Sequence, residues 1–297
     1  MRKKKYVLAM VSILIFCSLM IVFLTGFSTA KTLRDIKIKE VKDKSRYNTD
    51  AVEYWAVVIG TAPFDITYES TINDARGLYS ILVEHGWKKE NIKLLLGWQA
   101  SKSRIIRALN WLEKKADEND VVLFYFNGHG MRLSSIFNHF YDKAPKDEID
   151  DKDECIVAWG RYLLGKMAYI TDDQLGKIFD NIRSKNIVTI FDCCFSGGMI
   201  DGTYDLTKPN NVVITSCQTD EKSYPWEFSS GYYGVFSYFL IEALNGAADQ
   251  NKDNMISAEE AFIYAKEKTQ EFDKLPSQQN PDMYDGYLGE LILIHLK

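Results

Sequence analysis

Two short glycine-containing segments carry residue types that can perform nucleophilic chemistry. Asn127-Gly128-His129-Gly130 follows one apolar run, and Asp192-Cys193-Cys194-Phe195-Ser196-Gly197-Gly198 follows another. Glycines on both sides of His129 leave its imidazole uncrowded, and the glycines after Ser196 let backbone amides approach a reacting group closely. A histidine and a cysteine delivered to one place form the minimal pair of base and nucleophile. The two segments therefore predict thiol catalysis.

Simpler interpretations exist for each residue alone. A lone histidine after a strand is usually a hydrogen-bonded polar residue, and a buried free cysteine is usually a small apolar filler. Besides the adjacent pair and Cys17, the chain holds only Cys155 and Cys217, too few for a disulfide scaffold and without the spacing of a zinc site. The coincidence of both segments at strand ends favours the catalytic interpretation.

Alternating strands and helices must position the two segments. Short β-rich runs predict strands over 54–59, 91–95, 121–126 and 187–191. Helical periodicity predicts helices over 74–85, 103–116 and 172–183, the last capped by Thr171. Unbroken apolar strands suit a sheet that is buried on both faces. The pattern predicts an α/β fold: a three-layer α/β/α sandwich with a largely parallel central sheet, whose carboxyl edge carries both segments.

The two segments resemble the active-site motifs of the caspase, metacaspase and legumain group of cysteine peptidases, clan CD. Weaker similarity at 73–74, 153–157 and 234–237 extends the resemblance over nearly all of residues 52–297. The chain is most similar to metacaspase-like peptidases or to the archaeal and bacterial type of caspase-fold peptidase. The resemblance implies a caspase-like fold and a cysteine-type endopeptidase.

Roles follow from the resemblance residue by residue. It implies that His129 and Cys194 form the catalytic dyad and that backbone N–H groups of Gly128 and Cys194 hold the oxyanion. Acidic residues of metacaspase-like members correspond to Asp74 and Asp192 and line the pocket for the side chain before the cleaved bond. This match implies cleavage after Lys or Arg. The alternatives are a helix N-terminal carboxylate for Asp74 and a turn-forming residue for Asp192.

Two departures from the metacaspase pattern leave the subfamily open. Phe195 stands where histidine is usual, and Gly160 stands where aspartate often occurs. A catalytically silent caspase-like binding module and a legumain-like Asn-specific peptidase or transpeptidase remain alternative functions. The presence of both His129 and Cys194 favours an active enzyme.

Residues 249–260 have the ligand spacing of an EF-hand calcium loop. Oxygen atoms fall at loop positions 1, 3, 5, 7, 9 and 12, from Asp249, Asn251, Asp253, the Met255 carbonyl, Ser257 and Glu260. Asn254 takes the usual glycine position, and asparagine tolerates the left-handed conformation. A solvated acidic turn with Ser257 as helix cap is the alternative. The spacing predicts structural calcium, and no organic cofactor is expected.

A second acidic segment is a weaker candidate for a cation. It contains Asp147, Glu148, Asp150, Asp151 and Asp153. A charged surface loop is the simpler interpretation of this composition. Nearby lysines would be self-cleavage sites if the pocket selects basic residues; these are Lys143, Lys146 and Lys152.

The N-terminus has the pattern of an export signal. Four basic residues at 2–5 precede the uncharged run 6–27, and small residues follow at 28–30. The run is long enough to span a bilayer as a helix, so residues 1–30 are predicted to be a signal peptide or a retained signal anchor. The charge-rich stretch 31–50 is predicted to be a linker, and 51–297 the peptidase domain. We expect an exported protein, extracellular or anchored to the outer face of the cell membrane.

The amino-acid composition limits which classes of partner this protein is expected to bind. Hydrophobic residues make up 46% of the chain and charged residues 26%, which excludes a disordered or collagen-like protein. The formal net charge is −5 although the N-terminus is basic, so the body of the chain is acidic. An acidic body argues against nucleic acid as a partner. Peptides or proteins are the expected substrates, with membrane contact only through an uncleaved N-terminal segment.

Overall fold

The computed structural model describes residues 51–63, 67–132, 153–160, 168–202 and 206–297. The predicted signal segment, the linker, the three lysines and most of the second acidic segment lie outside the described residues. Among the described residues, no helix is both long and apolar enough to cross a membrane. Residues 52–297 form one compact unit.

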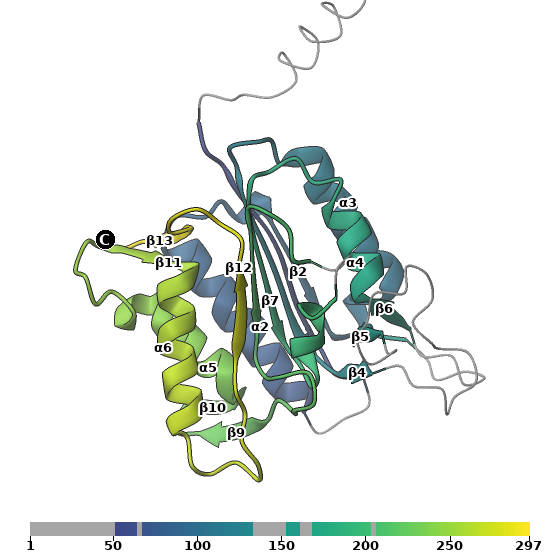
Figure 1. The fold of residues 1–297 in the computed structure, drawn as a ribbon, viewed down its shortest axis with the longest axis vertical. Helices are drawn as coiled ribbons and strands as arrows, with labels where there is room; N and C mark the ends of the chain where they lie inside the picture. Colours follow the sequence, from purple (N-terminus) through teal and green to yellow (C-terminus); the bar gives the residue numbers. More distant parts are fainter. Residues whose placement is uncertain (1–50, 64–66, 133–152, 161–167, 203–205) are drawn as a thin grey trace, which may run out of the picture. The chain divides into compact units, whose positions relative to one another are not determined.

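A six-stranded sheet forms the centre of this unit (Figure 1). Its spatial order is β12-β8-β7-β3-β1-β2, with β1 Tyr54–Thr61, β2 Ile92–Leu96, β3 Val121–Gly128, β7 Asn186–Asp192, β8 Asn211–Thr215 and β12 Asp282–Asp285. All neighbours pair in parallel except β12, which pairs with β8 in the antiparallel direction. In β3, every residue before Gly128 is buried, as expected for a strand covered on both faces.

Helices cover both faces of the sheet (Figure 1). One apolar cluster contains buried residues of α2 Tyr68–Glu84, α5 Val235–Glu242 and α6 Ala258–Glu271. The other contains those of α3 Lys102–Lys115 and α4 Asp172–Phe179. The two clusters use alternate residues of the central strands, so the sheet lies between two helical layers. The predicted three-layer α/β/α sandwich with a largely parallel sheet is confirmed.

Smaller elements surround the carboxyl edge and the C-terminal region. An antiparallel sheet is made of β4 Gly130–Arg132, β5 Glu154–Val157 and β6 Tyr169–Thr171. Two further antiparallel pairs are β9 Pro225–Phe228 with β10 Gly231–Gly234, and β11 Met255–Ser257 with β13 Ile292–His295. Short 3₁₀ helices lie at Lys89–Asn91, Gly97–Gln99 and Ser196–Met199, and a π-helical turn, Ala243–Ala247, follows α5.

Two predicted helix boundaries were wrong. Helix α2 begins at Tyr68, six residues before the predicted start. The Ser70 and Thr71 hydroxyls donate to the carbonyls of the preceding turn, at 2.7 and 2.9 Å, so these polar residues are accommodated within the helix. The interpretation of Asp74 as a helix N-terminal carboxylate is therefore wrong, because Asp74 lies well inside α2.

Helix α4 ends at Phe179, earlier than predicted, and the Asn181 side chain donates to the Lys177 carbonyl at 2.9 Å just beyond this end. Its predicted N-cap is confirmed. The Thr171 hydroxyl accepts a hydrogen bond from the Gln174 N–H at 3.2 Å. This cap fixes the start of α4 directly after β6.

Candidate active site

The ends of β3 and β7 bring the histidine and cysteine segments side by side. Asn127 is the register partner of Asp192, and His129 and Cys194 each follow two residues later. A Cβ atom on Gly130 would lie 2.0 Å from the Cys194 carbonyl oxygen, a distance that no side chain tolerates. Glycine after His129 therefore lets the backbones of the two segments touch. Both residues lie at the carboxyl edge of the sheet, where ligands gather in folds of this kind.

His129 is held between the central sheet and the small β4–β5–β6 sheet. Its backbone carbonyl accepts a hydrogen bond from the Val157 N–H at 2.9 Å, and β4 begins at the next residue. Its side chain is half-buried. The imidazole is thus carried by a backbone that is fixed on both sides, which suits a base that must stay in place during a reaction.

The two adjacent cysteines occupy different environments. Cys193 is 1% exposed and belongs to the apolar cluster under α3 and α4. Cys194 is half-buried, and its thiol donates to the Ser223 carbonyl at 3.7 Å. Burial raises the pKa of both thiols, that of Cys193 well above its ordinary value. Cys194 is the more accessible thiol, and it needs a base to become a thiolate.

Asp74 and Asp192 form a buried pair of carboxyl groups joined by Asn127. The Asn127 amide donates to Asp74 Oδ2 at 2.9 Å and to Asp192 Oδ2 at 3.3 Å. The Gly234 N–H also donates to Asp74 Oδ2, at 2.8 Å. The other Asp74 oxygen, Oδ1, is buried and accepts no hydrogen bond from the described residues. A buried acceptor without a donor is costly unless a ligand supplies one.

Burial is the main cause that raises the pKa of both carboxyl groups. For Asp74 the negative charge of Asp192 adds to burial and takes the pKa well above its ordinary value. Hydrogen bonds from the Ser223 and Ser237 hydroxyls partly offset burial at Asp192. A cation brought between the two groups would favour their charged forms.

Ser223 connects the carboxyl pair to the cysteine. Its hydroxyl donates a hydrogen bond to Asp192 Oδ1, and its carbonyl accepts a hydrogen bond from the Cys194 thiol. Gly234 completes the connection, because a Cβ atom there would lie 2.7 Å from Asp192 Oδ2 and 3.2 Å from Asp74 Oδ2. The predicted pocket residues and the predicted nucleophile are therefore parts of one hydrogen-bonded site.

A family model for the caspase domain matches residues 53–285. The chain belongs to the caspase domain family. Metacaspase-4 of Arabidopsis thaliana is 31% identical over 185 residues, which cover 60% of this chain and 40% of that protein. Metacaspase-1B of Neurospora crassa is 30% identical over 187 residues, with the same two coverages. The matched part of the caspase-domain chain thus spans less than half the length of these metacaspases.

A solved structure has the same fold. Protein GSU0716 from Geobacter sulfurreducens superposes with a TM-score of 0.58 at 16% sequence identity, covering 82% of this chain and all of that one. At this identity the likeness shows the fold alone. Together with the family match, it confirms the predicted caspase-like architecture and the resemblance to clan CD.

Glycines of the caspase domain have packing roles that sequence alone did not indicate. Gly128 lies against β1, where a Cβ atom would be 2.2 Å from the Thr61 carbonyl oxygen. Cβ atoms on Gly197 and Gly198 would lie 2.3 Å from the Thr219 nitrogen and 2.3 Å from the Glu154 side chain. The close approaches at 197 and 198 are thus to neighbouring segments of the protein itself.

The predicted calcium loop has an EF-hand-like turn whose acidic groups bond within the protein. Asn254 adopts the left-handed conformation, with φ of 63°. Asp249 accepts hydrogen bonds from the backbone of Asp253 and Asn254, both at 3.2 Å. Glu260 accepts from the Asn251 amide at 3.0 Å and from the Ser257 N–H at 3.1 Å. Ser257 caps α6, as the alternative interpretation expects.

No three His, Cys, Asp or Glu side chains in the described ranges are placed to hold a metal ion. Asp153 is the one member of the second acidic segment within the described residues, and it is buried.

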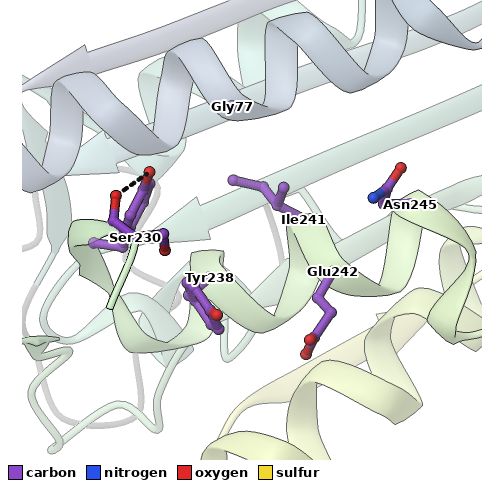
Figure 2. Close-up of a pocket in the computed structure, with 7 residues that line it drawn as sticks. Gly77, Ser230, Tyr238, Ile241, Glu242 and Asn245 are labelled. Atoms are coloured by element: carbon purple, nitrogen blue, oxygen red, sulfur yellow. Dashed lines mark hydrogen bonds between the residues drawn. The ribbon is translucent and has the colours of Figure 1, made fainter. Parts of the chain in front are cut away.

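A pocket of about 260 Å³ lies between α2 and α5 (Figure 2). It is lined by Gly77, Ser230, Tyr233, Tyr238, Ile241, Glu242 and Asn245. The Glu242 carboxylate accepts a hydrogen bond from the Tyr264 hydroxyl at 3.0 Å. None of these residues belongs to the dyad or to the carboxyl pair.

Proposed function

We propose that this caspase domain is a cysteine endopeptidase in which Cys194 is the nucleophile and His129 the base. One observation supports the proposal: Asn127 and Asp192 are in register at the ends of β3 and β7, His129 and Cys194 each follow two residues later, and Gly130 lies against the Cys194 carbonyl. The greater exposure of Cys194 supports it over Cys193 as the nucleophile. The match to the caspase family model supports peptide hydrolysis as the reaction.

The reaction proceeds in two stages. His129 takes the thiol proton of Cys194, and the sulfur attacks the peptide carbonyl carbon to form a C–S bond. Backbone N–H groups of Gly128 and Cys194 hold the oxyanion. As the C–N bond breaks, His129 gives its proton to the departing amine. Water, deprotonated by His129, then attacks the acyl-enzyme, and the proton returns to the Cys194 sulfur as the acid leaves.

Cleavage after Lys or Arg is the specificity that the carboxyl pair supports. Asp74 and Asp192 lie beside the Cys194 segment, and Asp74 Oδ1 is a buried acceptor without a donor among the described residues. A lysine ammonium or an arginine guanidinium supplies both the missing donor and the opposite charge. An aspartate side chain would bring a third negative charge to the same place.

A peptide library tests this function. The purified protein is expected to hydrolyse internal peptide bonds and to prefer Lys or Arg before the cleaved bond by about 100-fold or more over Asp or Asn, since the latter leave the buried carboxylates unpaired. Cleavage chiefly after Asn, or transfer of the acyl group to an added amine, would favour the legumain-like alternative. No cleavage of any library member would favour the silent binding module.

Export is the proposed setting of this activity. It rests on the basic residues 2–5 and the uncharged run 6–27, both outside the described residues. The substrates are then peptides or proteins outside the cytoplasm. The enzyme would meet them in solution if residues 1–30 are cleaved, or at the outer face of the membrane if residues 1–30 remain.

Calcium binding by the 249–260 loop is a further part of the proposal. The left-handed Asn254 and the pairing of β11 with β13 support an EF-hand-like loop, although its carboxylates would have to exchange their hydrogen bonds for the ion. We expect calcium at 100 times its Kd to raise the melting temperature by roughly 5–10 °C relative to chelator. Asp249→Ala should remove this difference. Equal melting temperatures with calcium and with chelator would leave the loop as an acidic turn.

A further inference from the structure

The residue after the nucleophile has an unusual backbone conformation. Phe195 adopts φ of 62° and ψ of 22°, the left-handed region in which a bulky side chain is rare. Its N–H donates to the Glu221 carbonyl at 2.9 Å. The Arg132 guanidinium lies over its ring, 5.4 Å from the ring centroid. The conformation that follows Cys194 is therefore held from outside the loop.

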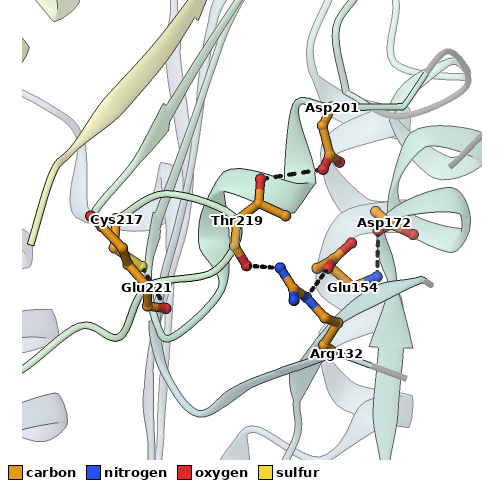
Figure 3. A network of polar contacts seen from close by, with 7 residues as sticks. All are labelled: Arg132, Glu154, Asp172, Asp201, Cys217, Thr219 and Glu221. Carbon is orange, nitrogen blue, oxygen red and sulfur yellow. Dashed lines mark hydrogen bonds and ion pairs between the residues drawn. The ribbon is translucent and has the colours of Figure 1, made fainter. Parts of the chain in front are cut away.

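Arg132 also binds two segments that flank this loop (Figure 3). Its Nε donates to Glu154 Oε1 of β5 at 3.1 Å, and a terminal nitrogen donates to the Thr219 carbonyl. Glu154 is 1% exposed, and its backbone N–H donates to Asp172 at 2.9 Å, at the start of α4. Arg132 thus joins β5 to the segment after β8.

The same two segments are the walls of the nucleophile loop, residues 193–199. Gly197 packs against the Thr219 nitrogen, and Gly198 packs against the Glu154 side chain, so closely that a Cβ atom fits at neither position. Arg132 therefore contacts both walls and the Phe195 ring of the loop between them. A change in the position of Arg132 would therefore weaken its contacts with Glu154, Thr219 and Phe195, which together hold the loop.

We propose that Arg132 is a positioning residue for Cys194, a role that rests on the proposed function of Cys194 as nucleophile. The guanidinium acts on the thiol through Phe195, Thr219 and Glu154 and does not take part in the chemistry. Arginine suits the role because its planar fork binds two acceptors while its face covers a ring. Lysine can supply charge at this place but not that combination.

Kinetics separate positioning from substrate binding. Arg132→Met is expected to lower kcat about 30-fold or more with KM within twofold, because the basic-residue pocket of Asp74 and Asp192 is untouched. Arg132→Lys should recover part of the loss. Arg104→Met is the matched control. Arg104 lies on α3, its guanidinium is 4.6 Å from the Trp98 ring centroid and donates to the Trp98 carbonyl, and its loss should change kcat less than twofold.

Two outcomes of the kinetics would overturn the proposal. A raised KM with unchanged kcat would make Arg132 a residue that binds substrate. An unchanged kcat in both Arg132 variants would remove any positioning role. If the methionine variant does not fold, as judged by its thermal transition, the lysine variant carries the same test.

Alkylation of Cys194 measures its positioning without requiring turnover. Iodoacetamide labelling, followed by peptide mass spectrometry over a pH series, is expected to show a changed Cys194 rate profile in Arg132→Met, by about fivefold or more, and an unchanged profile in Arg104→Met. In the Phe195→Gly background, where glycine adopts the left-handed conformation freely, the effect of Arg132→Met should shrink. Unchanged alkylation in Arg132→Met would contradict the proposal, whereas an inactive wild type with this expected labelling pattern would refute only the peptidase function.

Discussion

Cys194→Ala and His129→Ala are each expected to lower kcat by about 10³-fold or more, whereas Cys193→Ala should leave most of the activity. Nucleophile and base act as one unit, so the loss of either removes the covalent route. Cys193 is enclosed in the apolar cluster and can affect the reaction only through packing. Initial rates on a Lys- or Arg-containing peptide, together with thermal melts of each variant, measure this result.

The expected cost of Cys193→Ala is a small one in stability. Removing a buried sulfur leaves a cavity, for which a loss of about 1 kcal/mol in the free energy of unfolding is ordinary. Cys194→Ala removes a half-buried side chain and should melt close to the wild type. An inactive but folded Cys193→Ala, with an active Cys194→Ala, would show that the nucleophile is assigned one residue too late.

Asp74→Asn should reduce kcat/KM for Lys and Arg peptides by about 100-fold, the effect of removing one charge from a desolvated ion pair. The amide keeps the shape of the carboxyl group and can still accept from Asn127 and Gly234. Asp120→Asn is the matched control, because Asp120 is also buried but precedes β3, at the opposite end of the strand from His129. The control variant should retain its kcat/KM.

The carboxyl pair also predicts a dependence on pH. Burial raises the pKa of Asp74 and Asp192 in the folded protein, so both carboxyl groups become charged only above the ordinary range for aspartate. Recognition of Lys and Arg should therefore weaken as pH falls through these raised values. The contribution of these two carboxyl groups to folding stability changes in the opposite sense. It is fully present below the pKa that aspartate has in the unfolded chain, and it is lost as pH rises through the raised pKa of the folded protein.

Melting temperature against pH separates the two effects. In the wild type, the melting temperature should fall as pH rises from acidic to neutral. Asp74→Asn should show a smaller fall over this range and should also lose selectivity for basic residues. If Asp74→Asn cleaves Lys and Arg peptides as well as the wild type does, the carboxyl pair is a structural feature of the core and the specificity lies elsewhere.

The strands and the candidate catalytic segments could be predicted because their signals are local. An unbroken apolar run identifies β3, and glycines beside His129 mark the turn that follows it. The start of the helix that carries Asp74 could not be predicted, because Ser70 and Thr71 have low helix propensity. In the structure their hydroxyls donate to backbone carbonyls of the preceding turn, which accommodates them in the helix.

The partners of the site could not be predicted, because they meet only through the folded chain. Asn127 joins two carboxyl groups that lie 53 and 65 positions away in sequence, and Ser223 joins Asp192 to Cys194. Arg132 contacts Thr219 across 87 positions. Asn127 and Ser237 did stand within segments already singled out, but nothing in their types indicated a shared carboxyl pair.

Covalent labelling with a lysyl or arginyl chloromethyl ketone tests the central claim most directly, since the reagent requires the pocket, the base and the nucleophile together. Peptide mass spectrometry should find the adduct on Cys194 in the wild type. Labelling should be at least about 100-fold slower in His129→Ala and in Asp74→Asn, and absent from Cys193 in all three proteins. An adduct on Cys193, or equal labelling by a ketone that carries Asp in place of Lys, would contradict the account.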